Sequence, residues 1–212
     1  MATLKQKIWD SDRRLSLQIC TIPSATVTQA FAAAGADAVI IDLEHGAIDY
    51  ECAHAMIAAT AGTDCAPIIR IAKNDDAHVK RVLDLGAEGI CFPLIRTAQE
   101  AQWAVNSLRY PPAGTRSFGP FLAQSRYQTD MLTYAADFAD RAICIVLAET
   151  LEAVENIDEI CAAKGIDMII PAQFDLSTAL GIPGQFGHPD FKAAIAKIEA
   201  AAISAGVPLG GT

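Results

Sequence analysis

Short apolar, β-branched runs alternate along this chain with alanine-rich stretches whose apolar residues recur at helical spacing. This alternation begins near residue 15 and is typical of βαβ units around a parallel sheet. The expected strands are residues 15–21, 38–43, 67–71, 89–93, 143–148, 168–171 and 207–209. The expected helices are residues 25–34, 50–61, 77–85, 98–108, 151–161 and 189–205. Glycines follow most of these helices closely, as expected where a helix ends: Gly35, Gly62, Gly86, Gly165 and Gly206.

Repeated units of roughly 30 residues favour a (β/α)8 TIM barrel, a fold that typically needs about 250 residues. The alternative is an open doubly wound sheet, but no GxGxxG phosphate loop follows the first expected strand. With 212 residues, 52% of them hydrophobic, the chain is expected to form one domain over residues 1–212. A closed barrel would lack its eighth strand and last helix, so we expect the sequence to stop short of the native C-terminus.

Composition excludes several classes of function. The net charge of −9 and the absence of a clustered basic face argue against nucleic-acid binding. No segment approaches the roughly 20 apolar residues that span a bilayer, and residues 1–17 lack the apolar core of a secretory signal. The six cysteines form no CxxC pair, so we expect reduced thiols and a cytoplasmic location.

Residues 108–134 form a long segment that is too rich in proline, glycine and polar residues for a regular helix. They fall between the fourth and fifth expected strands, and we expect them on the face that carries catalytic loops. A connection of this length within a domain is usually either functional or disordered.

Chemically active side chains stand where the expected strands end, which is where parallel α/β enzymes place their active sites. These side chains are Asp42, Glu44, His45, Arg70, Glu149 and Asp175. Glu149 and Asp175 end consecutive strands, so their carboxylates could share Mg²⁺ or Mn²⁺. Equally, each acid could simply cap the helix that follows it.

His45 and Arg70 each allow two interpretations. His45 could transfer protons while a neighbouring carboxylate orients its ring, although a lone histidine after a strand is more often structural. Arg70 is flanked by isoleucines and needs an anionic partner, which could be a substrate oxygen or the carboxylate of Asp42 or Glu44.

The motifs together resemble the HpcH/HpaI class II aldolases. The resemblance covers nearly the whole chain and depends on six segments in order: GADAVIIDLEHG, PIIRIAKND, LDLGAEGICFPLI, RYPPAGTRSFGP, AET and FDLSTALGIPGQFGHPDF. It implies a (β/α)8 barrel that makes or breaks a carbon–carbon bond between pyruvate, as its enolate, and an aldehyde.

The resemblance also implies roles for individual residues. Glu149 and Asp175 match the family's ligands to Mg²⁺, Mn²⁺ or Co²⁺, and Arg70 matches the arginine that holds the keto or enolate oxygen. His45 matches a histidine that acts through water as acid and base, with Asp42 or Asp84 as its orienting carboxylate. Family assemblies imply a homo-oligomer, a trimer or hexamer, in which Asp84 reaches a neighbouring subunit's site.

Some positions depart from the family pattern. Ala172, Gln173 and Phe174 replace a Gly-Pro-Ala run that approaches the pyruvate carboxylate, Leu147 replaces a glutamine, and Ser117 replaces a glycine. These changes leave the proposed ligands intact but alter the pocket around them. Two rival functions follow: a related lyase that acts on a CoA thioester, and a non-catalytic homologue that only binds an oxo acid.

Overall fold

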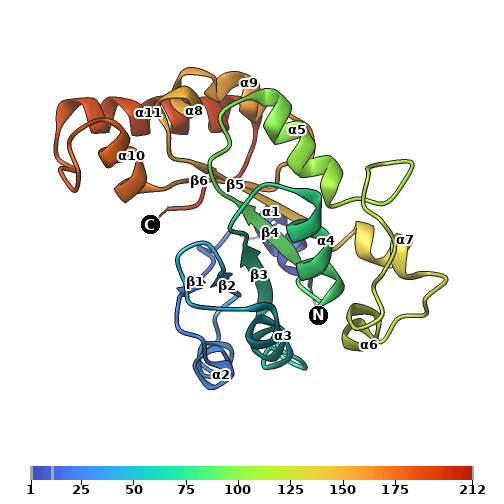
Figure 1. The fold of residues 1–212 in the computed structure, drawn as a ribbon. Helices are drawn as coiled ribbons and strands as arrows, with labels where there is room; N and C mark the ends of the chain where they lie inside the picture. Colours follow the sequence, from blue (N-terminus) through green and yellow to red (C-terminus); the bar gives the residue numbers. More distant parts are fainter. Residues whose placement is uncertain (1, 11, 212) are drawn as a thin grey trace. The chain divides into compact units, whose positions relative to one another are not determined.

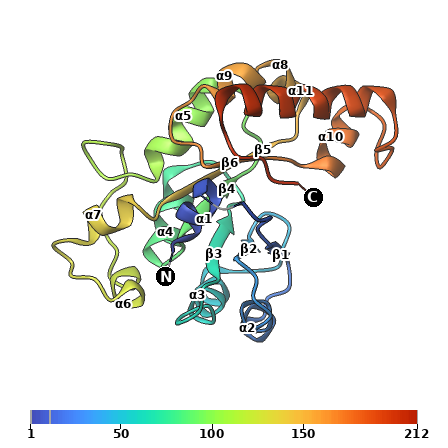
Figure 2. The ribbon, with the colours of Figure 1, turned by 180° about the vertical axis from the view of Figure 1, so that it is seen from behind.

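The structure is a computed structural model that describes residues 2–10 and 12–211. Its contacts divide the chain into two compact units, residues 1–91 with 106–143 and residues 92–105 with 144–212. The first unit contains α1 (Leu4–Asp10), β1 (Leu17–Cys20), α2 (Ala25–Ala33), β2 (Ala38–Asp42), α3 (Tyr50–Ala58), β3 (Ala66–Arg70), α4 (Asp76–Asp84), most of β4 (Gly89–Phe92), α6 (Ala123–Tyr127) and α7 (Tyr134–Ala139). The second contains most of α5 (Ala98–Ser107) and of β5 (Ile143–Ala148), then α8 (Leu151–Glu155), α9 (Ile157–Cys161), β6 (Met168–Pro171), α10 (Gln173–Ala179) and α11 (Pro189–Ala205) (Figures 1 and 2).

Strands of the first unit pair in parallel in the order β1-β2-β3-β4. All five residues of β2 are buried, as expected for a strand covered on both faces. Outside the strands, α2 packs against α3 (Figure 1). The register sets Asp42 directly opposite Arg70 at the ends of β2 and β3. This alignment places one acid and one base side by side at the edge where the two strands end.

The amino end of β2 is fixed by the buried Asp37. Its carboxylate accepts hydrogen bonds from Arg13, from Lys7 at 3.2 Å and from the Ser16 N–H at 3.0 Å. The hydrogen bond from Arg13 is the main reason that the pKa of Asp37 falls to about 2. The residues ahead of β1 are thereby tied to the start of β2.

In the second unit β5 and β6 pair in parallel, with Ala148 aligned to Pro171. The long helix α11 packs along α9 and α8 (Figure 2). The expected strand at residues 207–209 is reduced to a single parallel bridge between Leu209 and Ile169. The chain therefore contributes six regular strands over the described residues.

The sequence predicted most of these elements within a few residues. The first six strands are confirmed, and the glycines after the helices adopt positive φ angles between 67° and 106°. The α/β class with parallel strands in sequence order is confirmed within each unit. The closed eight-stranded barrel, the single domain over residues 1–212 and the missing C-terminal elements stay predictions. The expected helix 151–161 is divided at Asn156 into α8 and α9.

The prediction that residues 108–134 lie on the face that carries catalytic loops was wrong. Arg126 donates to the Ile57 carbonyl, and the Tyr127 hydroxyl donates to the Gly86 carbonyl. Ile57 and Gly86 lie at the ends of α3 and α4, where the chain turns back into strands. The segment follows a helix and precedes a strand, so it belongs to the amino ends of the strands.

None of the six cysteines, all of which the structure describes, takes part in a disulfide, and five of them are buried. Among the described residues, no helix combines the length and the apolar content that crossing a bilayer requires.

Candidate functional site

Arg70 and Asp42 form a two-point ion pair at the carboxyl end of β2 and β3. Arg70 Nε donates to Asp42 Oδ1 at 2.8 Å, and Nη2 donates to Oδ2 at 2.5 Å. Arg70 Nε also lies 3.5 Å from Glu44 Oε2. The ion-pair interpretation of Arg70 is therefore confirmed, and the pair holds the planar guanidinium in a fixed orientation.

Each charge of this pair opposes the effect of burial on the pKa of the other. Burial alone would raise the pKa of Asp42, but the hydrogen bonds and charge of Arg70, with two backbone N–H groups, leave that pKa below its usual value. Burial likewise works to lower the pKa of Arg70, and Asp42 raises it above its ordinary value. Both side chains are therefore ionised at neutral pH.

The turn after β2 positions His45. Asp42 Oδ1 accepts the N–H of Glu44 at 3.0 Å and that of His45 at 3.3 Å, so the carboxylate shapes the backbone of the turn. A Cβ atom at Gly46 would lie 2.3 Å from the Asp42 carbonyl oxygen, which explains the glycine there. The imidazole is 61% exposed, and its Nε2 lies 3.9 Å from Glu44 Oε2. The carboxylate nearest the ring thus belongs to Glu44, while Asp42 binds the backbone of the turn.

Asp84 is not brought to His45 within the first unit. It ends α4 on the side of the amino ends of the strands, whereas Asp42 ends β2 at the carboxyl side. Asp84 Oδ1 accepts a hydrogen bond from Arg116 Nη2 at 2.7 Å, and Arg116 is buried against Tyr110 and Phe138. Burial raises the pKa of Asp84, and Arg116 only partly offsets it. The role of Asp84 in a neighbouring subunit, and the oligomer itself, stay predictions.

Glu149 follows β5 directly and is buried. Its Oε1 accepts the backbone N–H of Leu94 at 2.5 Å. The helix that follows is capped by Thr150, whose hydroxyl accepts the Ala153 N–H at 3.0 Å. The capping interpretation of Glu149 is therefore wrong, because the neighbouring threonine performs that task.

Asp175 lies inside the first turn of α10, which begins at Gln173, and does not stand at the capping position before the helix. The N-cap residue is Ala172, which has no side chain that could cap the helix. Among the residues that the structure describes, the exposed Asp175 carboxylate makes no hydrogen bond.

Glu149 and Asp175 leave the same edge of the second unit. Ala148 pairs with Pro171, and the Ala172 N–H donates to the Ala148 carbonyl at 3.3 Å. Paired strands are about 4.8 Å apart, so the backbones of Glu149 and Ala172 lie close together, and Asp175 follows Ala172 by three residues in the first turn of α10. Over residues 2–10 and 12–211 no cluster of three or more His, Cys, Asp and Glu side chains could hold a metal. A cation here would therefore need water or substrate oxygens to complete its coordination.

One residue beside these acids was missed by sequence reasoning. Leu94 has a φ angle of 52°, in the left-handed region that side chains other than glycine rarely adopt. No glycine or asparagine marks the position, so the sequence carries no signal for this turn. Its N–H nevertheless provides the hydrogen bond that holds Glu149.

Comparison with known proteins decides the family. The family model described as "HpcH/HpaI aldolase/citrate lyase" matches residues 21–211. The chain belongs to this family. The family resemblance seen in the sequence is thereby confirmed, and so is the prediction that the chain is a carbon–carbon lyase.

Individual members of the HpcH/HpaI family are similar over most of the chain. A 2-dehydro-3,6-dideoxy-6-sulfogluconate aldolase of Pseudomonas putida is 35% identical over 88% of this chain and 73% of its own length. A pyruvate aldolase of Rhizobium etli is 34% identical over 83% of this chain and 69% of its own length. The crystal structure of a family protein from Burkholderia cenocepacia superposes with a TM-score of 0.89 at 32% identity, covering 98% of this chain and 83% of that one.

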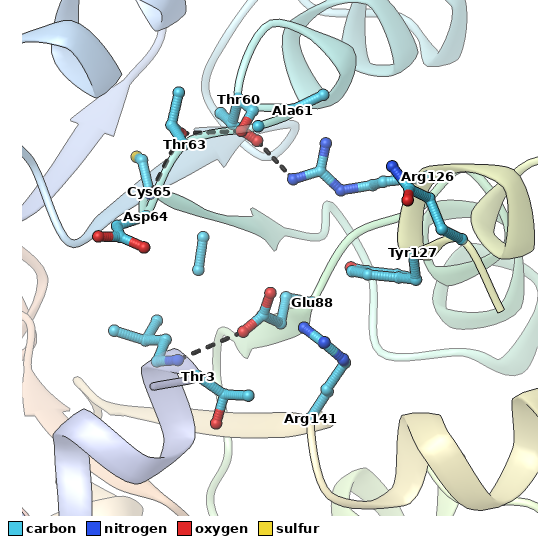
Figure 3. A pocket seen from close by; sticks show the side chains of 14 residues that line it. Thr3, Thr60, Ala61, Thr63, Asp64, Cys65, Glu88, Arg126, Tyr127 and Arg141 are labelled. Carbon is cyan, nitrogen blue, oxygen red and sulfur yellow. Dashed lines mark hydrogen bonds between the residues drawn. The ribbon is translucent and has the colours of Figure 1, made fainter. Parts of the chain in front are cut away.

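This HpcH/HpaI chain also has a polar cavity of about 220 Å³ in its first unit. Figure 3 shows Arg126 directed toward Thr60, and Arg141 and the buried Glu88 line the same cavity. Glu88 Oε1 accepts a long hydrogen bond from the Leu4 N–H at 3.4 Å. The cavity lies at the amino ends of β3 and β4, away from the edge that carries Asp42 and Arg70.

Replacing Glu88 by glutamine is expected to flatten the pH dependence of stability. Burial raises the pKa of Glu88, and Arg141, the Leu4 N–H and Arg126 offset this only partly. The folded state therefore keeps the proton to higher pH than the unfolded state. Its stabilising contribution is complete below the ordinary glutamate pKa of about 4.3 and is lost as pH rises through the folded-state pKa. Urea unfolding of both proteins from pH 4.5 to 8 tests this, and an unchanged difference between them at every pH would contradict it.

Proposed function

We propose that the chain is a divalent-metal-dependent class II aldolase acting on 4-hydroxy-2-oxo acids. It would cleave or form the bond between pyruvate, as its enolate, and an aldehyde. The observation that carries the proposal is that Glu149 directly follows β5, while Asp175 lies in the first turn of the helix after β6, the strand that pairs with β5. The pyruvate aldolase named among its relatives supports the same reaction class.

The donor set fits a hard cation. Two carboxylates without cysteine or histidine suit Mg²⁺, Mn²⁺ or Co²⁺ better than zinc, and they leave positions open for an oxygen-rich substrate. The hydrogen bond from Leu94 occupies Oε1 of Glu149 and orients its carboxylate. When bound, the cation would withdraw electron density from the keto group of the oxo acid.

Arg70 would stabilise the negative charge that grows on the pyruvyl oxygen during cleavage. The carboxylates of Asp42 and Glu44 hold its guanidinium in place, so little reorganisation is needed as the charge develops. Arg70 thereby favours the transition state over the bound substrate. Residues 172–174 are the proposed contacts for the carboxylate of the oxo acid, through their backbone.

His45 would move the proton. In cleavage the hydroxyl proton on C4 passes, through water, to the imidazole while the C3–C4 bond breaks and its electron pair enters the enolate. The same imidazole, acting through water, then returns a proton to C3 and yields pyruvate. Exposure of the ring and its loose contact with Glu44 leave it accessible to water.

Proton exchange on pyruvate tests the proposal. With Mg²⁺ or Mn²⁺ in D₂O, the protein is expected to exchange the methyl protons of pyruvate, and EDTA is expected to stop the exchange. Adding a small aldehyde should then give a 4-hydroxy-2-oxo acid. His45→Ala should slow exchange about 10²-fold while Mn²⁺ binding is retained. Metal and pyruvate binding without exchange would instead favour the non-catalytic oxo-acid binder, and activity only toward an acyl-CoA would favour the thioester lyase.

A further inference from the structure

Two large apolar side chains remain exposed beside the proposed metal ligands of the second unit. Phe174 immediately precedes Asp175 and is 72% exposed. Leu94, whose N–H is bonded to Glu149, is 40% exposed. Phe174 is the neighbour of Asp175 in the sequence, and Leu94 is hydrogen-bonded to Glu149.

The ring of Phe174 is held in position without being covered. It contacts Phe186 edge-on, with ring centroids 5.1 Å apart and planes at 85°. The ring centroid of Phe186 in turn lies 5.3 Å from that of the buried Phe191 at the start of α11. The buried end of this aromatic row anchors it, and Phe174 is its exposed end. A ring fixed in this way offers an apolar surface at a low cost in conformational entropy on binding.

Leu94 is held in an unfavourable conformation that exposes it. Its φ angle of 52° is one that non-glycine residues keep only where the surroundings impose it, often at functional sites. The hydrogen bond to Glu149 supplies that constraint, and the next residue, Ile95, is fully buried. The backbone therefore buries one aliphatic residue and leaves the other beside a proposed ligand.

We propose that Leu94 and Phe174 contact the aldehyde, and that the preferred aldehyde therefore carries an apolar group. The inference rests on the proposed aldolase function and adds the class of its second substrate. Neither side chain can donate or accept a hydrogen bond, so a hydroxylated aldehyde would lose water contacts there without replacement. An apolar aldehyde would lose no such contacts and would remove ring surface from water. Phe174 and Leu94 are thus specificity-determining residues.

Competing aldehydes test the inference. The ratio of kcat/KM for isobutyraldehyde to that for glycolaldehyde, both with pyruvate and Mg²⁺, measures the preference. We expect a ratio of at least about 10 for the natural chain, and a fall of about tenfold or more in Phe174→Ala. Phe174→Leu should keep most of the preference, because it restores an apolar surface. Leu94→Ala should also lower the ratio of kcat/KM values.

Ile203→Ala is the matched control. Ile203 is also 72% exposed and lies in the second unit, but it stands on α11 away from the proposed ligands. Its replacement should leave the ratio and the activity unchanged.

The outcomes separate the two proposals. If pyruvate protons exchange but the ratio is near or below one, or if Phe174→Ala does not change it, the inference on the aldehyde is overturned and the aldolase proposal stands. If Phe174→Ala instead changes only the mass of the oligomer measured by sedimentation, the ring contacts a second copy of the chain. The inference is then also overturned. If no exchange occurs with either metal, the aldolase proposal fails and the inference fails with it.

Discussion

Replacing Glu149 by alanine is expected to abolish the metal-dependent activity. The side chain is buried after β5, and it supplies one of the two carboxylates of the proposed ligand pair, the other being that of Asp175. Removal would leave one carboxylate for the cation, so both Mn²⁺ affinity and turnover should fall. We expect kcat to drop by about 10³-fold, which is the scale of losing one preorganised electrostatic group.

Glu149→Gln separates charge from shape. Its amide oxygen can still accept the Leu94 N–H, so the turn at Leu94 and the fold should be preserved. Titration with Mn²⁺, followed by electron paramagnetic resonance, should show weakened binding by the neutral side chain. The control is Glu152→Gln, an exposed acid in the first turn of α8, which should change neither binding nor turnover. Undiminished turnover in Glu149→Ala would refute the assignment of this ligand.

Periodicity explains why the fold could be predicted in outline. Buried parallel strands such as β2 and β5 are continuous apolar runs, and glycines such as Gly86 and Gly206 stop helices by adopting positive φ angles. The start of α10 was harder to predict, because its N-cap is Ala172 and carries no capping side chain. The boundary of a helix without such a signal depends on tertiary packing.

The side chains at strand ends were found from sequence because parallel strands bring their ends to one edge. The hydrogen-bond partners of these side chains were harder to predict. Asp42 was a candidate for orienting His45, yet its oxygens are engaged by Arg70 and by two backbone N–H groups of its own turn. The bond between Arg116 and Asp84 joins residues 32 positions apart. Such pairings follow from the register of strands and the course of loops, which single-sequence patterns do not encode.

Replacing Arg70 by methionine is expected to reduce both stability and activity, for separate reasons. Asp42 is fully buried, so removal of its partner leaves an uncompensated charge in the interior. Breaking a buried pair in this way costs about 3 kcal/mol or more of the free energy of unfolding. Burial then acts on Asp42 without its main opposing charge, so its pKa should rise above the unfolded value. The variant should therefore be most stable at acidic pH and lose stability as pH increases, which urea unfolding measures.

The double variant Arg70→Met with Asp42→Leu distinguishes structure from catalysis. With both charges removed, two apolar side chains face each other at paired positions of β2 and β3, so the stability lost to the unpaired charge should return, less the contribution of the two backbone hydrogen bonds that Asp42 accepts from Glu44 and His45. Activity should not return, because no cation remains to stabilise the pyruvyl oxygen, and kcat should stay about 10²-fold to 10³-fold below that of the natural chain. Arg70→Lys should also remain slow, since an ammonium group cannot form the two-point contact with Asp42. Recovery of turnover together with stability in the double variant would show that Arg70 only supports the fold, because the restored framework would then be sufficient for the reaction.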